Sequence, residues 1–216
     1  MSSSIENTIP KCINLDIIIL LDESGSMEEM GNEPIQALNE FCSNQKCNTS
    51  SKSTISITLF NNKINNIIDN IPLVSFKGIQ SYKPFGMTAL NDAICLTIKN
   101  KLDYNKTNTN VNTNNVIILI ITDGLENAST KYNTIYRNKL IKMVKDKYKW
   151  EIIYLGANHD VVAECKEMNI KPNNCGIFQC NTPGTLLSLF RSASNSITNF
   201  YSNKDEEIDI NVNTNI

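Results

Sequence analysis

The chain has 216 residues, of which 41% are hydrophobic and 19% charged, so it can bury a full core and is not disordered overall. Its formal net charge of -2 at pH 7 gives no basic surface for phosphate backbones, and we expect no nucleic-acid partner. The apolar run at 17–21 is far too short to cross a membrane, so no membrane association is expected.

Seven cysteines, an odd number, are scattered along the chain, and the N-terminal segment lacks the basic region of a secretory signal peptide. Both features favour reduced thiols and a cytoplasmic protein. The pairs Cys42/Cys47 and Cys175/Cys180 share one spacing, which is not that of a structural zinc site. We therefore expect buried or half-buried thiols at these positions.

The first half of the chain begins with a lead-in at 1–12. A strand follows at about 14–21, and its lack of apolar–polar alternation is typical of a strand buried on both faces. Pro34 suits the first turn of a helix that runs to about residue 45. Residues 54–60 alternate as a strand does, and 63–69 are predicted to form the antiparallel partner of a hairpin.

In the second half, a connection at 73–85 leads to a helix predicted from Gly86 to about residue 101, and then to an Asn/Thr-rich loop at 103–114. Residues 116–121 repeat the buried apolar pattern of the first strand. The later predicted elements are a helix at 131–148, a strand at 150–155, a short helix at 160–168, an edge strand at 176–180 and a last helix from Leu186 to Phe200.

This alternation of strands and helices predicts an α/β fold with a doubly wound, mostly parallel sheet and helices on both faces. We expect residues 13–201 to form one domain. Residues 202–216 are polar and acidic, so a frayed tail is expected there.

Two of the buried strands are each followed by an aspartate. The run at 17–21 leads into Asp22, and the run at 116–121 leads into Thr122 and Asp123. Open α/β sheets place their ligand sites at the carboxyl ends of strands. The sequence therefore points to a site that includes both carboxylates.

Hydroxyl groups accompany these aspartates. Ser24 and Ser26 follow Asp22 at alternate positions, and Thr88 lies between the two strands at the junction of a loop and a helix. The five candidate ligands are Asp22, Ser24, Ser26, Thr88 and Asp123. They offer only hard oxygen atoms, which suit Mg²⁺, Mn²⁺ or Ca²⁺ better than zinc or copper.

This set resembles the metal-ion-dependent adhesion site of von Willebrand factor A domains, in which an Asp-x-Ser-x-Ser motif is followed by a distant Thr and a distant Asp. The chain is most similar to the compact intracellular members found in bacteria, phages and large DNA viruses. The resemblance implies a six-stranded sheet of order 3-2-1-4-5-6 with one antiparallel edge strand. It also implies that Mg²⁺ is held with a free coordination position, which an Asp or Glu of a protein partner fills.

Other interpretations stay open at this point. The aspartates and serines are also typical of turns, and Thr88 is also typical of a helix N-cap. An enzyme that uses the metal for hydrolysis or phosphotransfer, and a virion or scaffold protein with a vestigial site, are the alternative functions. We favour a binding module without catalytic activity, located in the cytoplasm, or in the virion or host cytoplasm if the protein is viral. His159 is expected to be a surface loop residue and Asp160 the N-cap of the following helix.

Overall fold

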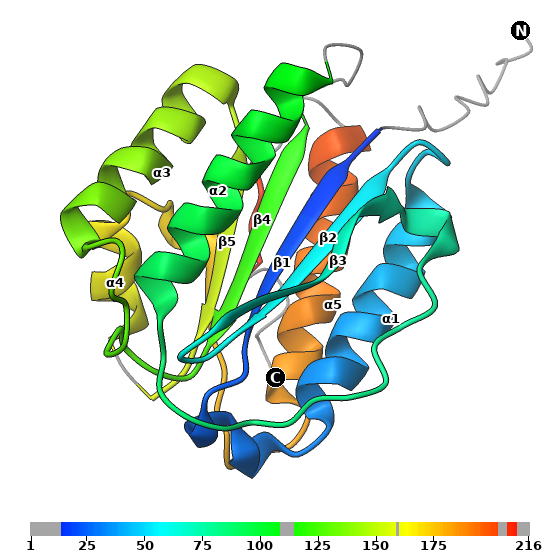
Figure 1. The fold of residues 1–216 in the computed structure, drawn as a ribbon. Helices are drawn as coiled ribbons and strands as arrows, with labels where there is room; N and C mark the ends of the chain where they lie inside the picture. The colour runs from blue at the N-terminus through cyan, green and yellow to red at the C-terminus, as the bar shows by residue number, and fades with distance from the viewer. Residues whose placement is uncertain (1–13, 109–114, 159, 203–206, 211–216) are drawn as a thin grey trace, which may run out of the picture.

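A six-stranded sheet forms the centre of the molecule in the computed structural model, which describes residues 14–108, 115–158, 160–202 and 207–210 (Figure 1). The strand order is β3-β2-β1-β4-β5-β6, with β2 and β3 antiparallel and every other pair parallel. The strands are β1 (Asp16–Asp22), β2 (Thr54–Phe60), β3 (Ile64–Pro72), β4 (Val116–Thr122), β5 (Glu151–Gly156) and β6 (Cys175–Ile177). The predicted fold class and strand order are confirmed.

The two central strands are the apolar runs that the sequence singled out. All seven residues of β1 and all seven of β4 are buried. The strands pair in parallel, from Asp16 beside Val116 to Leu21 beside Ile121. An uninterrupted apolar sequence is what a strand covered on both faces requires.

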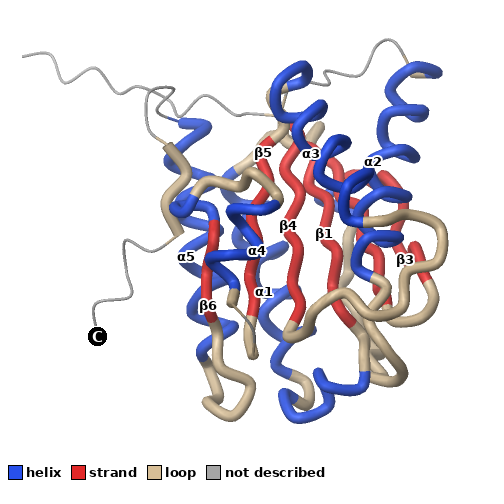
Figure 2. Tube along the Cα trace, turned by 90° about the vertical axis from the view of Figure 1, so that its left-hand side faces the viewer, coloured by secondary structure: helices blue, strands red, loops and turns tan. Residues whose placement is uncertain are grey.

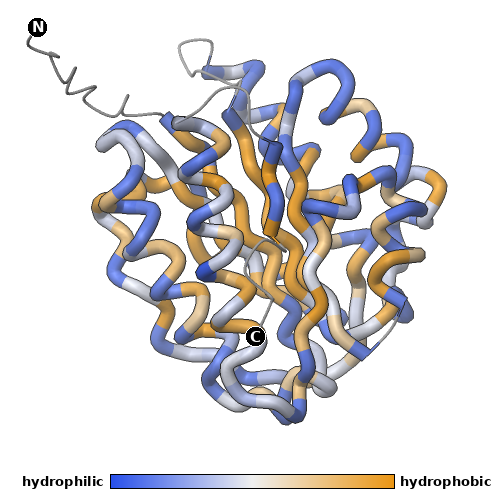
Figure 3. The backbone as a smooth tube through the Cα atoms, turned by 180° about the vertical axis from the view of Figure 1, so that it is seen from behind, coloured by the Kyte–Doolittle hydropathy of each residue, from blue (hydrophilic) through white to orange (hydrophobic). Residues whose placement is uncertain are grey.

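Helices cover both faces of the sheet (Figures 1 and 2). Apolar side chains of α1 and α5 pack on one face, and those of α2, α3 and α4 pack on the other. Figure 3 shows the strands between these layers as the most hydrophobic part of the chain. The helices are α1 (Glu33–Asn48), α2 (Leu90–Thr107), α3 (Thr134–Tyr148), α4 (Val161–Glu167) and α5 (Thr185–Ser202), with short 3₁₀ turns at Gly25–Met30, Leu73–Ser75 and Pro172–Asn174. None of the described helices is long and apolar enough to cross a membrane.

The helix α2 differs from its prediction at both ends. It begins at Leu90 rather than at Gly86, because Gly86 has a left-handed φ of 81° that no α-helix accommodates. It continues to Thr107, so residues 103–107, which we expected in a loop, are helical. The ion pair between Lys106 and Asp103 lies on this last turn. The strand β6 is also shorter than the predicted 176–180 and ends at Ile177.

The segment at 207–210 packs against the domain, so the prediction that the whole chain after residue 201 is a tail is wrong for these residues. Ile208 and Ile210 are buried in the core on the α1/α5 side. The amide of Ile210 donates to the carbonyl of Asn173 at 2.9 Å, and the amide of Asp209 donates to Ser196 Oγ at 2.7 Å. The lead-in at 1–12 and the rest of the predicted tail after Ser202 lie outside the described residues.

A disulfide joins Cys165 of α4 to Cys175 of β6. The prediction of reduced thiols is therefore wrong for these two residues. Cys42, Cys95 and Cys180 are buried thiols, whereas Cys47 is exposed, so the expectation of a buried or half-buried thiol is wrong for Cys47. Disulfides persist mainly in oxidising compartments, so this bond does not fit the expected reducing environment, and the cytoplasmic location stays a prediction.

Candidate metal site

The candidate ligands come from three loops at the carboxyl ends of β1 and β4. Asp22 is the last residue of β1, and Asp123 directly follows β4. Because β1 and β4 are neighbours, these two positions lie side by side at the lower edge of the sheet in Figure 1. The connection after β3 crosses this edge and brings in Thr88, just before α2.

Hydrogen bonds link four of the five residues into a continuous chain. The amide of Ser24 donates to Asp22 Oδ1 at 2.7 Å, and the hydroxyls of Ser24 and Ser26 are 3.1 Å apart. The hydroxyl of Ser26 then donates to Asp123 Oδ1 at 2.6 Å. The fold thus brings the Asp-x-Ser-x-Ser loop into direct contact with an aspartate 97 positions further along the chain.

Thr88 belongs to the same cluster. A Cβ atom placed on Gly124 would lie 3.5 Å from Thr88 Oγ1 and 3.9 Å from Ser26 Oγ, so both hydroxyls face the backbone next to Asp123. Asn127 holds Thr88 there, because its side-chain Oδ1 accepts from the Thr88 amide at 2.7 Å and its own amide donates to the Thr88 carbonyl at 3.0 Å.

The N-cap interpretation of Thr88 is wrong. The N-cap position of α2 is Ala89. The first free amides of the helix are satisfied by another loop, since Asn91 N donates to Glu126 Oε2 at 2.6 Å and Asp92 N donates to Ser129 Oγ at 2.9 Å. Glu126 therefore caps this helix.

The carboxylates of the cluster are buried. Asp22 is 0% exposed and Asp123 is 2% exposed. The net effect of its surroundings raises the pKa of Asp22 to about 6, and burial is the main cause. Hydrogen bonds from Thr122 and Ser24 oppose this rise, and the nearby Asp123 adds to it. A divalent cation between the two aspartates would favour the ionised form of Asp22, because opposite charge opposes the effect of burial.

The donor set consists of two carboxylates and three hydroxyls. Oxygen donors of this kind are those that Mg²⁺, Mn²⁺ and Ca²⁺ prefer. Within the described ranges, no group of three or more His, Cys, Asp or Glu side chains is placed to hold a metal ion. The present cluster is not such a group, because only two of its five side chains are carboxylates.

Two supporting residues were not predicted from the sequence. Thr122 Oγ1 donates to Asp22 Oδ2 at 2.6 Å, and the Tyr82 hydroxyl donates to the Asp22 carbonyl at 2.5 Å. Asp22 Oδ1 also accepts from the Ser24 amide and so closes a turn. Asp22 is therefore both a turn residue and a member of the cluster. The position of Thr122 at the end of a buried strand could have indicated its role from the sequence. No local sequence feature indicates that Tyr82 contacts Asp22.

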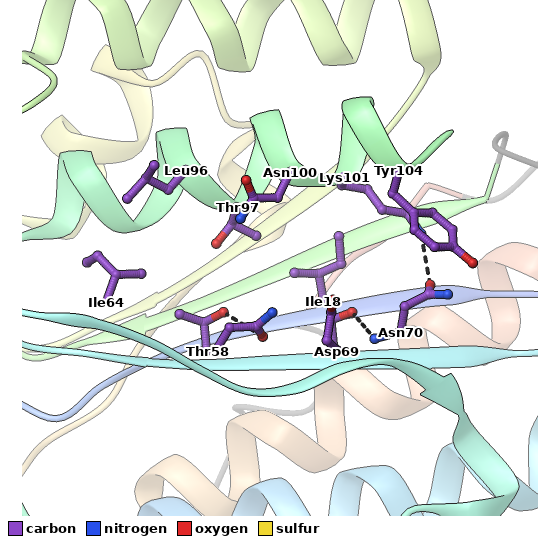
Figure 4. A pocket seen from close by; sticks show the side chains of 12 residues that line it. Ile18, Thr58, Ile64, Asp69, Asn70, Leu96, Thr97, Asn100, Lys101 and Tyr104 are labelled. Carbon is purple, nitrogen blue, oxygen red and sulfur yellow. Dashed lines mark hydrogen bonds between the residues drawn. The ribbon is translucent and has the colours of Figure 1, made fainter. Parts of the chain in front are cut away.

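Outside this cluster, Asp160 is the N-cap of α4 as predicted, since its Oδ1 accepts from the Ala163 amide at 2.9 Å. His159 lies outside the described residues. A separate cavity of about 170 Å³ lies between the β2–β3 hairpin and α2 and contains none of the five candidate ligands (Figure 4).

Comparison with solved structures identifies the fold. The von Willebrand factor domain of the type V pili tip protein from Porphyromonas gingivalis is 9% identical and aligns with 91% of this chain and 99% of its own, at a TM-score of 0.64. The von Willebrand factor type A protein from Catenulispora acidiphila is 14% identical over 87% of this chain and 43% of its own, at 0.59. Manganese-loaded TRAP protein from Plasmodium vivax is 17% identical over 82% and 73%, at 0.55.

These structures show that the chain has the von Willebrand factor A fold. No protein-family model and no curated protein matches the sequence. The chain spans less than half of the Catenulispora protein and 47% of proximal thread matrix protein 1 from the mussel byssus, another structure of similar fold. At these identities, the similarity extends to the fold alone.

Proposed function

We propose that this chain is a protein-interaction module that binds an acidic side chain of its partner through a divalent metal ion, with Mg²⁺ as the physiological ion. Asp22, Ser24, Ser26, Thr88 and Asp123 would hold the ion. The observation that supports this most strongly is the hydrogen-bonded cluster itself, in which oxygen-bearing side chains from three distant loops meet at adjacent strand ends. The manganese in the TRAP protein of the same fold adds support for the metal.

The composition of the cluster favours binding over catalysis. The three hydroxyls are neutral, so they would hold an ion without cancelling its charge, and the bound ion supplies an electrophilic position for a carboxylate. The chain itself would orient that position and keep the two aspartates away from water.

The enzyme alternatives lack their usual residues. Ser24 stands where a phosphotransferase of the Asp-x-Asp type needs a carboxylate. Asp22 stands where a hydrolase with a Gly-x-Ser-x-Gly motif needs its first glycine. We therefore propose that the protein is not an enzyme.

Calorimetric titration with Mg²⁺ and Mn²⁺ tests the site. We expect wild-type protein to bind one ion and Asp123→Ala to bind none, because it loses one of the two carboxylates. Asp103→Ala removes an exposed carboxylate of α2 and should bind like the wild type. Equal binding by wild type and Asp123→Ala would contradict the site, and no binding by any of them would favour a scaffold with a vestigial site.

Partner capture then tests the function. We expect proteins retained by the wild type in Mg²⁺ to be released by chelator and not to be retained by Asp123→Ala. Capture that is unchanged in chelator would contradict metal-bridged binding. Metal-dependent phosphatase or esterase turnover that Asp123→Ala abolishes would favour the enzyme alternative.

A further inference from the structure

Three large apolar side chains are exposed next to the candidate metal site. The exposed fractions are 78% for Phe85, 51% for Met87 and 54% for Leu125. They are three of the eight large hydrophobic residues that are exposed in the described parts of the chain. Such side chains are ordinary when they occur singly, but a group beside a polar centre marks an interaction surface.

The backbone holds this group, the apolar rim, against the site. Met87 directly precedes Thr88, and Leu125 directly follows Gly124. The Phe85 amide donates to the Glu23 carbonyl at 2.9 Å, and Gly25 N donates to the Gly86 carbonyl at 3.0 Å. The rim is therefore attached to the same three loops that carry the candidate ligands.

The flank of the site beside Cys180 is mainly polar. Cys180 Sγ lies 3.9 Å from Asp123 Oδ2 and lines a hollow of about 420 Å³. Its other lining residues are the polar Glu29, Asn158, Gln179 and Asn181 and the apolar Ile177 and Phe178. Among the sequence neighbours of the candidate ligands, the exposed large apolar side chains are Phe85, Met87 and Leu125.

We propose that the apolar rim binds a bulky aliphatic or aromatic side chain that adjoins the acidic residue on the partner. This inference rests on the proposed function and defines the partner's chemistry more closely. The ion attracts any accessible carboxylate, so it provides little discrimination by itself. Apolar contacts around the ion exclude water and let the protein select an Asp or Glu set in an apolar surface.

Two capped peptides probe this preference, acetyl-Gly-Leu-Asp-Leu-Gly-amide and acetyl-Gly-Ser-Asp-Ser-Gly-amide, titrated by NMR in Mg²⁺. We expect the leucine peptide to bind about fivefold to tenfold more tightly, as burial of apolar side chains predicts. Replacing Asp by Asn in either peptide should remove the dependence of its binding on Mg²⁺.

The triple variant Phe85→Ser/Met87→Ser/Leu125→Ser locates the preference. It should bind both Asp peptides equally and retain the wild-type affinity for Mg²⁺. The matched control is Val74→Ser/Val162→Ser, which removes exposed apolar side chains from the 3₁₀ turn at Leu73–Ser75 and from α4 and should keep the preference.

The possible failures are distinguishable. Equal binding of both Asp peptides to the wild type, or a preference that survives in the triple variant, would overturn the role of the rim and leave metal-bridged binding intact. Loss of Mg²⁺ affinity in the triple variant would show that these residues act on the ion and would also overturn that role. If neither Asp peptide binds in Mg²⁺, the proposed function fails, and this inference fails with it.

Discussion

Gly86 has a special role at the candidate site because a side chain there would be strained and would displace Asn62. Its φ is 81°, and a Cβ atom there would lie 2.2 Å from Asn62 Oδ1. That oxygen accepts from the Met87 amide at 2.7 Å. Because Gly86 has no side chain, Asn62 can approach the backbone here and hold the segment that leads into Thr88. The position of this candidate ligand therefore depends on Gly86.

Gly86→Ala should weaken Mg²⁺ binding at least tenfold and lower the free energy of unfolding by about 2–3 kcal/mol, because it combines left-handed strain with displacement of the Asn62 side chain that accepts from Met87. Gly184→Ala is the matched control. Gly184 also has a left-handed φ, 86°, but nothing lies within 4 Å of its Cβ position. We expect it to cost about 1 kcal/mol and to leave Mg²⁺ binding unchanged. Calorimetry and urea unfolding measure both effects, and equal behaviour of the two variants would contradict this account.

A buried ion pair connects a helix to the central strand. Lys101 of α2 pairs with Asp16 at the start of β1, and their side chains are only 5% and 7% exposed. Lys101 Nζ also donates to Asn70 Oδ1 of β3 at 3.1 Å, at the end of the cavity drawn in Figure 4. Lys101 therefore joins α2 to β1 and β3 at the end of the sheet that lies opposite to the candidate metal site.

Lys101→Met should lower the free energy of unfolding by about 3–5 kcal/mol, because it leaves the Asp16 carboxylate buried without its partner. The double variant Asp16→Leu/Lys101→Met should recover much of this loss. Lys106→Met breaks the exposed pair with Asp103 on the same helix and should leave stability unchanged. Urea unfolding measures all three variants. A loss for Lys101→Met no larger than that for Lys106→Met would show that the buried pair contributes nothing particular.

The domain as a whole is closed by a segment beyond its last helix. The side chain of Ile210 reaches β6, where its Cδ1 atom would lie 3.0 Å from a Cβ atom placed on Gly176. Lys171 pairs with Glu207 across the same junction. The core on the α1/α5 side is therefore completed by residues that follow α5.

Ile210→Ala should lower the free energy of unfolding by about 2–4 kcal/mol, because it opens a cavity in a core that is fully buried at this point. Ile177→Ala is the control, since Ile177 of β6 is 62% exposed and its truncation should cost less than about 1 kcal/mol. Thermal and urea unfolding measure both. Equal stability of the two variants would mean that the segment at 207–210 is not part of the folded core.

The sequence by itself determined the architecture of this protein. The apolar runs of β1 and β4 indicated strands buried on both faces, and the alternation of strands and helices indicated a doubly wound sheet. The candidate ligands were also visible, because Asp22, Ser24 and Ser26 adjoin one buried strand and Asp123 adjoins another. These features are local, because the spacing of apolar residues within a segment indicates whether it is a helix or a strand and which of its faces are buried.

Only the tertiary structure decided how distant residues meet. The bond from Thr122 to Asp22 spans 100 positions, the contact from Tyr82 to Asp22 spans 60, and the Cys165–Cys175 disulfide and the docking of Ile210 depend on where β6 lies. The contacts that satisfy the first amides of α2 are also distant, because Glu126 and Ser129 come from another loop. Such contacts depend on the register and order of strands, which no single segment of the sequence specifies.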